Sequence, residues 1–388
     1  MTGKYPARLH LTNFIVGGAP LDRKLLTPDW TKGLPLEEVT IAEALKGAGY
    51  ATAHFGKWHL GKHPPETQGF DRSQMTYKPR ESARDRQPPD SDAHNVRLIT
   101  EKSLEFIEDN RETPFFLIAS HNSVHTPLME KEELIRKYEA KEGASLPGNR
   151  PVIGAMIQTL DESVGVILDK LRELDLKENT IVIFFSDNGH HGRKDIPPFR
   201  GSKGDLYEGG IRMPLVIRWL AVVPSGSVCD EVVISNDFLP TFREIAGARS
   251  SAERADGVSI LPLLKGPDAG LDREAVYWHF PHYHGAGLGP QGAVREGRFK
   301  LIEWFGKSVY GDPGAFELYD LVEDPGEQEN LADIAPEVTA RLKGKLAVMP
   351  YAICKRAPRQ RCGGRARGSP FSSCWSSSPL SPSYTGPN

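Results

Sequence analysis

The sequence lacks the signs of a membrane-spanning or secreted chain. No apolar run approaches the roughly 18 to 20 residues that cross a bilayer, since the longest strongly apolar stretch is residues 181–185. The first residues, MTGKYPARLHLTNFIVGG, lack the charged start, apolar centre and small-residue cleavage site of a secretory signal. These absences predict a soluble chain without a membrane span, which is either cytoplasmic or preceded by a segment that this sequence does not contain.

Carboxylates are absent from the last part of the sequence. No Asp or Glu follows Glu337, and residues 341–388 carry nine Lys and Arg, so the net charge of -3 conceals a more acidic body. That balance argues against a nucleic-acid partner. Residues 348–388 are rich in Ser, Pro, Gly and Arg, which predicts a low-complexity, basic and disordered tail. A tail that contacts an acidic partner and a change of reading frame near residue 348 are both compatible with this composition.

The rest of the chain has a globular composition with alternating strand and helix patterns. Hydrophobic residues make up 39% and charged residues 26%, so the chain can bury a sizeable core. Apolar residues recur at three-to-four spacing from Val152 to Leu171, which predicts a long amphipathic helix over residues 151–174. Further helices are expected at residues 37–47, 94–109 and 131–141.

Four apolar runs predict the strands of a mostly parallel sheet flanked by helices. They are residues 50–55, 115–120, 180–185 and 214–219. Because the runs are apolar on both faces, they suit the covered interior of such a sheet. We therefore expect an α/β domain over residues 1–271.

A different pattern begins near residue 272. Short, closely spaced strand patterns and a final helical pattern predict a small antiparallel subdomain over residues 272–347. The expected strands are residues 275–280, 291–295, 298–304 and 316–320, and the expected helix is near 335–347.

The strongest local polar signal directly follows an apolar run. Ser186, Asp187, Asn188 and Gly189 come after the run at 180–185. In open α/β sheets, ligands gather beyond the carboxyl ends of the strands, and a carboxylate beside an amide oxygen supplies hard ligands for Ca²⁺ or Mg²⁺. An Asx turn at a strand end explains the same four residues equally well.

Two further motifs combine glycine with cations. Residues 200–212 begin with RGSKG, which contains Lys203, and end with EGGIR. Glycine lets backbone approach a ligand closely and Lys and Arg bind tetrahedral oxyanions, although an ordinary surface loop also fits. The segment GKWHLG at residues 56–61 sets Lys57 and His59 two positions apart, so both can face one side. It lacks the pattern of a nucleotide-binding P-loop.

A histidine follows another apolar run. His125, in the tripeptide HTP, comes shortly after residues 115–120, where a structural role is also reasonable. Three of the four motifs thus follow strand-like runs, and together they offer cations, imidazoles and oxygen ligands. That combination suits an oxyanion ester cleaved beside a divalent metal.

Seven motifs occur along the chain in a characteristic order. They are GYATAHFGKWHLG (49–61), TQGFD (67–71), HTP (125–127), SDNG (186–189), RGSKGDLYEGGIRMP (200–214), NDFLPT (236–241) and ELYDLVEDPGEQENLA (317–332). In this order they resemble a type I sulfatase, the arylsulfatase type of the alkaline phosphatase superfamily. The resemblance runs from the first residues to about residue 347, and the GKWHLG and RGxKG…EGGxRxP strings are its most specific parts.

The resemblance implies a sulfuric ester hydrolase that acts on a sulfated glycan or small aryl sulfate. In such enzymes a Cys in a C-x-[PS]-x-R motif becomes formylglycine, whose hydrate attacks sulfur while Ca²⁺ positions the sulfate. Asp187 and Asn188 match a pair of metal ligands, and Asp187 is also placed to polarise the attacking hydroxyl. Members of the family are commonly secreted, periplasmic or lysosomal.

The resemblance also assigns four catalytic residues. Lys57 and His59 match the pair beside the formylglycine, with His59 as the base that collapses the sulfated intermediate. His125 and Lys203 match groups that hold sulfate and assist the leaving oxygen. The physical chemistry agrees with these roles, because cations offset the charge on sulfate and an imidazole can move protons near neutral pH.

The sequence departs from the family at the nucleophile. None of its four cysteines (Cys229, Cys354, Cys362 and Cys374) stands in C-x-[PS]-x-R, and their placement does not suggest a disulfide framework. The family motif lies just upstream of a stretch that resembles residues 2–11, and the family's first strand carries an Asp-Asp pair that completes the Ca²⁺ site. We therefore expect that this chain lacks the first strand, the nucleophile and half of the metal ligands, and that it is inactive alone.

Three interpretations remain open at this point. The chain is a truncated sulfatase, a non-catalytic sulfatase-like binding protein, or a phosphoesterase of the same superfamily, although the GKWHLG and RGxKG strings speak against the last. Residues 277–284 are rich in aromatic rings and imidazoles, which suits either stacking on a sugar or aryl ring or an ordinary strand and turn.

Overall fold

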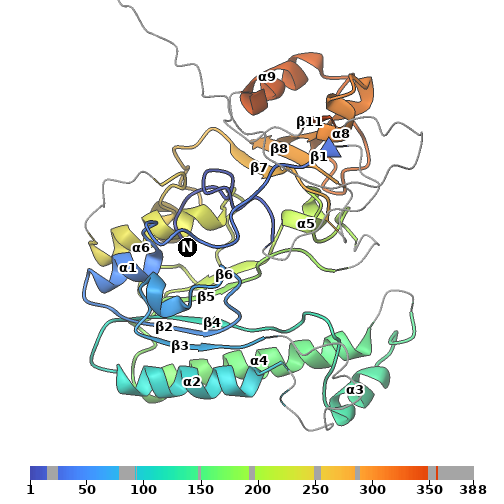
Figure 1. The fold of residues 1–388 in the computed structure, drawn as a ribbon. Helices are drawn as coiled ribbons and strands as arrows, with labels where there is room; N and C mark the ends of the chain where they lie inside the picture. The colour runs from blue at the N-terminus through green and yellow to red at the C-terminus, as the bar shows by residue number, and fades with distance from the viewer. Residues whose placement is uncertain are drawn as a thin grey trace, which may run out of the picture. The chain divides into compact units, whose positions relative to one another are not determined.

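A three-stranded parallel sheet organises the first part of the chain (Figure 1). Its central strand β2 (Ala51–Gly56) pairs in parallel with β3 (Arg72–Met75) and β4 (Phe115–Ser120). Ala51 lies opposite Phe115 and Gly56 opposite Ser120, so β2 and β4 end at the same edge. The computed structural model describes residues 1–14, 25–77, 92, 94–146, 150–191, 197–248, 255–284, 289–347 and 355–356.

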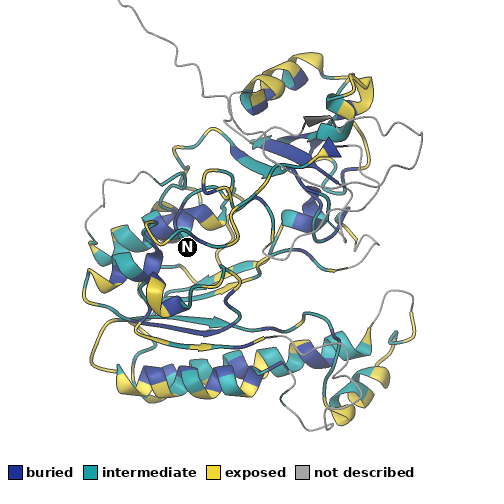
Figure 2. Cartoon of the chain, in the orientation of Figure 1, coloured by how far each residue is buried: buried dark blue, intermediate teal, exposed yellow. Residues whose placement is uncertain are grey.

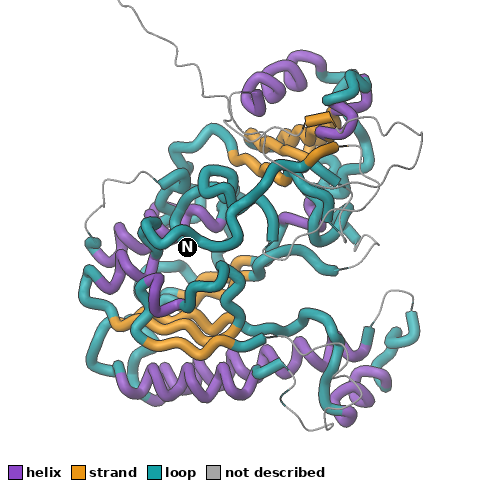
Figure 3. The backbone as a smooth tube through the Cα atoms, in the orientation of Figure 1, coloured by secondary structure: helices purple, strands orange, loops and turns teal. Residues whose placement is uncertain are grey.

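The helices expected before and after these strands are confirmed within a few residues. They are α1 (Ile41–Lys46), α2 (Val96–Asp109), α3 (Glu132–Glu139) and α4 (Pro151–Glu173). A capping box starts α1. The Thr40 hydroxyl accepts a hydrogen bond from the Glu43 backbone N–H, and the Glu43 carboxylate accepts one from the Thr40 backbone N–H. Helices α2 and α4 run side by side along one face of the sheet (Figure 3), where Ile99 and Phe106 of α2 join the core of β2.

Strands β5 (Val182–Phe185) and β6 (Leu215–Arg218) differ from the expectation of covered, parallel strands. They pair with each other in antiparallel orientation, and Phe184, Phe185 and Val216 are 42%, 41% and 61% exposed. Within the described residues β5 and β6 form a separate two-stranded sheet. The side chains of Phe184, Phe185 and Val216 are therefore not covered on both faces as the sequence pattern predicted.

The small antiparallel sheet expected after residue 272 is confirmed. Strands β7 (Val276–Phe280), β8 (Gln291–Glu296), β9 (Phe299–Trp304) and β10 (Phe316–Asp320) form a meander in that order. One face packs on α9 (Pro336–Ala347), whose buried residues are seen in Figure 2 on the side toward the sheet. The opposite face packs on Leu206 and Tyr207, which precede α5 (Glu208–Ile211).

Shorter elements connect these parts. They are β1 (Leu25–Leu26), η1 (Pro65–Gln68), η3 (Ser235–Asp237), α6 (Phe238–Ala246), α7 (Leu261–Lys265), α8 (Phe305–Ser308), η4 (Pro313–Ala315) and β11 (Lys355–Arg356). Lys355 and Arg356 belong to the tail expected to be disordered, yet they pair with β1. The rest of that tail lies outside the described residues, and the domain boundaries at 271 and 347 remain predictions.

Helix α4 is long and apolar enough to cross a membrane by length and composition alone. It packs instead along α2 and α3, and its buried residues include Ala155 and Met156. A core helix passes the same test as a membrane span, so this helix is weak evidence for one. The expectation of no membrane span stands as a prediction.

We predict that Arg273→Met strongly destabilises the chain. Arg273 Nη1 lies 2.7 Å from Asp237 Oδ1, and the two side chains are 8% and 0% exposed. The substitution leaves a buried carboxylate without its cation, which costs about 3–5 kcal/mol of unfolding free energy. Urea unfolding measures the loss.

The matched control is Arg172→Met, because Arg172 pairs with Asp169 at 2.7 Å on the surface. Its unfolding free energy should stay close to that of the unmodified chain, since exposed ion pairs contribute little. Equal losses of unfolding free energy in Arg273→Met and Arg172→Met would contradict the expectation that burial makes the Arg273–Asp237 pair important.

Candidate functional site

The carboxyl ends of β2 and β5 meet at a lysine–aspartate contact. Lys57 directly follows β2, and its backbone N–H donates to the Ser120 carbonyl at the end of β4, at 2.8 Å. Its Nζ lies 3.2 Å from Oδ2 of Asp187, two residues after β5. The two side chains are 27% and 66% exposed, so the pair adds little stability. The Lys57–Asp187 pair instead marks the position of a charged site.

His59 lies within the field of these charges. His59 is exposed at the surface, and its pKa is lowered by desolvation in the loop, lowered further by the Lys57 and Lys203 ammonium groups and opposed by the Asp187 carboxylate. The imidazole is therefore neutral at neutral pH, with a lone pair that can accept a proton. Lys57, His59, Asp187 and Lys203 are thus close enough to influence one another.

The segment that carries Lys203 is attached to the SDNG loop by its backbone. The Lys203 N–H donates to the His190 carbonyl at 2.8 Å, and the Gly189 N–H donates to the Gly210 carbonyl at 3.1 Å. A Cβ on Gly189 would lie only 2.0 Å from the Gly209 carbonyl oxygen. These glycines therefore let two loops approach each other, whereas the sequence suggested that they approach a ligand.

The two arginines of the same segment differ in role from Lys203. Arg200 Nη1 donates to the Tyr319 hydroxyl at 3.0 Å and to the Glu327 carbonyl at 2.9 Å, and its guanidinium stacks over Tyr207. Arg212 lies over the Phe199 ring. Arg200 Nη1 therefore links the motif to Tyr319 of β10 and to Glu327, and the expected oxyanion contact of this arginine stays a prediction.

The two remaining expected residues have local contacts. His125 follows β4, and its ring Nδ1 lies 2.8 Å from the Thr126 carbonyl oxygen. Asn188 donates from Nδ2 to the Gly189 carbonyl at 3.3 Å. Both residues follow strands that end near this edge, while the direct contact is the one between Lys57 and Asp187. The assigned roles of all six residues remain predictions.

Asp187 and Asn188 are the expected Ca²⁺ ligands, and their side chains offer three oxygens, two from the carboxylate and one from the amide. The Lys57 ammonium lies 3.2 Å from Asp187 Oδ2. Among the described residues, no three His, Cys, Asp or Glu side chains group closely enough to hold a metal ion. Since Ca²⁺ takes six to eight oxygens, these two side chains alone do not fill its coordination shell.

A further imidazole was not singled out by the sequence. Burial lowers the pKa of His284, and the Lys203 and His191 charges add to this, which places His284 near the cationic edge. Its ring makes edge contacts with Phe14 and Phe280, at centroid distances of 5.2 and 6.0 Å. The sequence indicated His284 only through the many aromatic rings and imidazoles of residues 277–284. Part of that segment is the ordinary strand β7.

A parallel sheet with cations and a carboxylate at its carboxyl edge, followed by a small antiparallel sheet, is the architecture of the alkaline phosphatase superfamily. Residues 1–248 match the family model described as Sulfatase, and residues 202–350 match one described as N-sulphoglucosamine sulphohydrolase, C-terminal. The chain belongs to the sulfatase family.

Curated relatives carry the same family name. An Arylsulfatase of Hemicentrotus pulcherrimus is 31% identical over 84% of this chain and 66% of the relative. The Arylsulfatase A of Homo sapiens is 29% identical over 88% of this chain and 75% of the relative. The chain thus spans roughly two thirds to three quarters of these relatives.

Solved structures agree on the fold. The crystal structure of Ps i-CgsB in complex with k-i-k-neocarrahexaose has a TM-score of 0.72 at 23% identity, covering 89% of this chain and 79% of that one. A structure in complex with its substrate D-glucosamine-2-N,6-O-disulfate has a TM-score of 0.65 at 20% identity, covering 89% and 85%.

We predict that Lys57→Met raises the pKa of His59. An adjacent cation disfavours the imidazolium, so its removal makes protonation easier, and the freed Asp187 carboxylate acts in the same direction. The His59 ring signals in an NMR titration from pH 4 to 8 measure the change. Lys62→Met is the control, because Lys62 is an exposed lysine of the same loop. A pKa that stays unchanged or falls in Lys57→Met would contradict the assigned electrostatics.

Proposed function

We propose that the edge containing Lys57, His59 and Lys203 binds the sulfate group of a sulfate ester, with His125 contributing beside them. The observation that carries this proposal is the 3.2 Å contact between Lys57 and Asp187 beyond the ends of β2 and β5, and it is supported by His59, whose pKa the Lys57 and Lys203 ammonium groups lower. Ammonium groups stabilise a sulfate oxyanion by charge-assisted hydrogen bonds. Membership of the sulfatase family supports the same assignment.

Each residue has a distinct role in this proposal. Lys57 and Lys203 offset negative charge on the sulfate oxygens, and His125 assists the leaving oxygen. His59 accepts and returns protons, which its lowered pKa favours because the ring is neutral at neutral pH. Asp187 orients Lys57 through their 3.2 Å contact.

The substrate class we propose is a sulfated glycan or a small aryl sulfate. Two relatives are named arylsulfatases, and one structure of similar fold holds a disulfated glucosamine described as its substrate. The rings of His284 and Phe14 beside the cationic edge offer surfaces for a sugar or aryl ring.

The cysteine pattern favours a second function for this polypeptide. Covalent sulfate-ester cleavage by the family mechanism needs a formylglycine, and none of the four cysteines lies in C-x-[PS]-x-R. We therefore propose that these 388 residues alone bind sulfate esters without turning them over. Sulfatase membership and a binding role are compatible, because oxyanion contacts do not depend on the nucleophile.

We predict that the chain binds inorganic sulfate and that Lys203→Ala weakens this binding roughly 10- to 100-fold, since one hydrogen bond to a charged group contributes about 1.5–3 kcal/mol. Isothermal titration calorimetry with sodium sulfate at constant ionic strength measures both affinities. Lys62→Ala serves as the control for general loss of positive charge. Equal sulfate affinities of Lys203→Ala and the unmodified chain would contradict the proposed site.

An aryl sulfate assay of the same preparations distinguishes binding from catalysis. The unmodified chain should release no phenol. Turnover that both Lys203→Ala and His125→Ala abolish would overturn the proposed inactivity, whereas turnover that neither abolishes would come from a contaminant.

We also propose that Asp187 and Asn188 bind Ca²⁺ only weakly. Their three side-chain oxygens fall short of a complete coordination shell, and Ca²⁺ must displace the Lys57 ammonium from Asp187. We predict a dissociation constant weaker than about 10⁻⁴ M by calorimetry. Tight binding that Asp187→Ala abolishes would mean that other side chains complete the site.

A further inference from the structure

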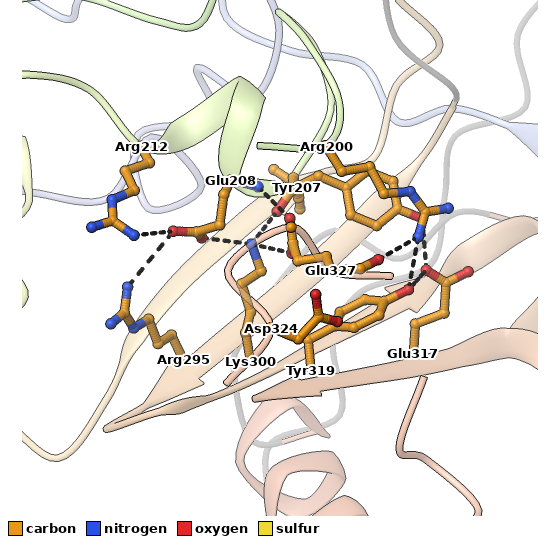
Figure 4. A network of polar contacts seen from close by, with 12 residues as sticks. Arg200, Tyr207, Glu208, Arg212, Arg295, Lys300, Glu317, Tyr319, Asp324 and Glu327 are labelled. Carbon is orange, nitrogen blue, oxygen red and sulfur yellow. Dashed lines mark hydrogen bonds and ion pairs between the residues drawn. The ribbon is translucent and has the colours of Figure 1, made fainter. Parts of the chain in front are cut away.

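A buried cluster of charges lies beneath the segment that carries Lys203 (Figure 4). Lys300, on β9, is 0% exposed. Its Nζ lies 2.7 Å from Glu208 Oε1, 2.6 Å from Glu327 Oε1 and 3.0 Å from the Leu206 carbonyl oxygen. The contacts to Glu208 and Leu206 are hydrogen bonds, and the contact to Glu327 is an ion pair. Both hydrogen-bond acceptors belong to the segment 200–212.

The same cluster holds the segment at further points. Glu327 Oε2 accepts from the Glu208 backbone N–H at 2.6 Å, and the Glu327 carbonyl accepts from Arg200 at 2.9 Å. Glu327 makes these contacts with a φ of 54°, a left-handed conformation that costs an L-residue about 1 kcal/mol or more. The surrounding contacts therefore hold Glu327 in a conformation that it would not adopt by preference.

Two tyrosines extend the network toward β10. The Tyr207 hydroxyl donates to Glu317 Oε2 at 2.6 Å, and the Tyr319 hydroxyl donates to the same oxygen at 2.9 Å while it accepts from Arg200. Figure 4 shows Arg200 and Lys300 reaching this network from opposite sides. The C-terminal sheet thus anchors the segment through both backbone and side chains.

Stability alone gives no reason to use charges here. A buried ion cluster replaced by well-packed apolar side chains is often equally stable, and Leu206 and Tyr207 already pack in an apolar cluster with Ala293 and Ile302. Hydrogen bonds are directional, so each acceptor must lie at a defined position around the Lys300 ammonium. The opposite side of the segment is bonded to the SDNG loop through the Lys203 N–H and the Gly210 carbonyl.

We propose that Lys300 is a positioning residue, which with Glu208 and Glu327 holds the segment 200–212 so that Lys203 faces the Lys57–Asp187 edge. This inference rests on the proposed function for the role of Lys203. Lys203 lies three residues before Leu206 and five before Glu208, so a shift of these anchors displaces the ammonium that binds sulfate.

A double-mutant cycle tests the proposal. Sulfate affinity is measured by calorimetry for the unmodified chain, Lys300→Met, Lys203→Ala and the double variant. Lys300→Met should weaken sulfate binding about tenfold, a size typical of coupling within one network. In the Lys203→Ala background it should cause no further loss, because its effect passes through Lys203. A full further tenfold loss in that background would overturn the proposal.

Lys345→Met is the matched control. Lys345 also lies between two carboxylates, at 2.7 Å from Glu274 and 2.9 Å from Glu296, and its pairs lie away from the segment 200–212. Sulfate affinity should stay unchanged in this control. If Lys300→Met does not fold, Glu208→Gln replaces it, because it removes one ion-pair partner of Lys300, and Tyr319→Phe, which removes one anchor of Arg200, should cause a smaller loss through Lys203.

Amide hydrogen exchange separates this proposal from the proposed function. In Lys300→Met, or in Glu208→Gln, the peptide 200–212 should exchange faster, while β2 and β4 exchange as before. Uniformly faster exchange, or no change in the peptide, would overturn the positioning role. If the unmodified chain binds no sulfate through Lys203, the proposed function fails, and the exchange result still decides whether Lys300 positions the segment.

Discussion

The buried Lys300 ammonium joins the C-terminal antiparallel sheet to the segment that carries Lys203. It comes from the antiparallel sheet, yet one carboxylate and one carbonyl that satisfy it belong to the segment with Lys203. A buried charge with an unsatisfied proton is costly, so the segment and β9 must keep their relative positions. The other side of that segment is hydrogen-bonded to the SDNG loop. The position of the segment is therefore linked to the edge where Asp187 contacts Lys57.

Lys57, Lys203 and Asp187 all act on the pKa of His59, because the two ammonium groups lower it and the carboxylate opposes them. In the proposed function the two ammonium groups would offset the negative charge of a sulfate group. For Ca²⁺, the side chains of Asp187 and Asn188 offer fewer oxygens than the six to eight that the ion takes.

The proposed binding role and the covalent chemistry of the family rest on different groups. The proposed sulfate contacts use Lys57 and His59, which follow β2, and Lys203 of the segment 200–212. Covalent chemistry in the family requires a converted cysteine, and no cysteine of this sequence lies in the required motif. In our proposal the C-terminal sheet affects binding, because it orders the segment that carries Lys203.

The sequence by itself determined the order and type of most elements, because periodicity and local motifs depend on nearby residues. Strand β4 and helix α4 match their expected ranges to within one residue, and Lys57 and Asp187, although distant in sequence, were both assigned to one site. Tertiary structure alone decided the exposure of Phe184, the turn of Arg200 toward Tyr319, and the burial of Lys300 between Glu208 and Glu327. The contacts of Arg200 with Tyr319 and of Lys300 with Glu208 join residues 119 and 92 positions apart, and no local pattern carries that information.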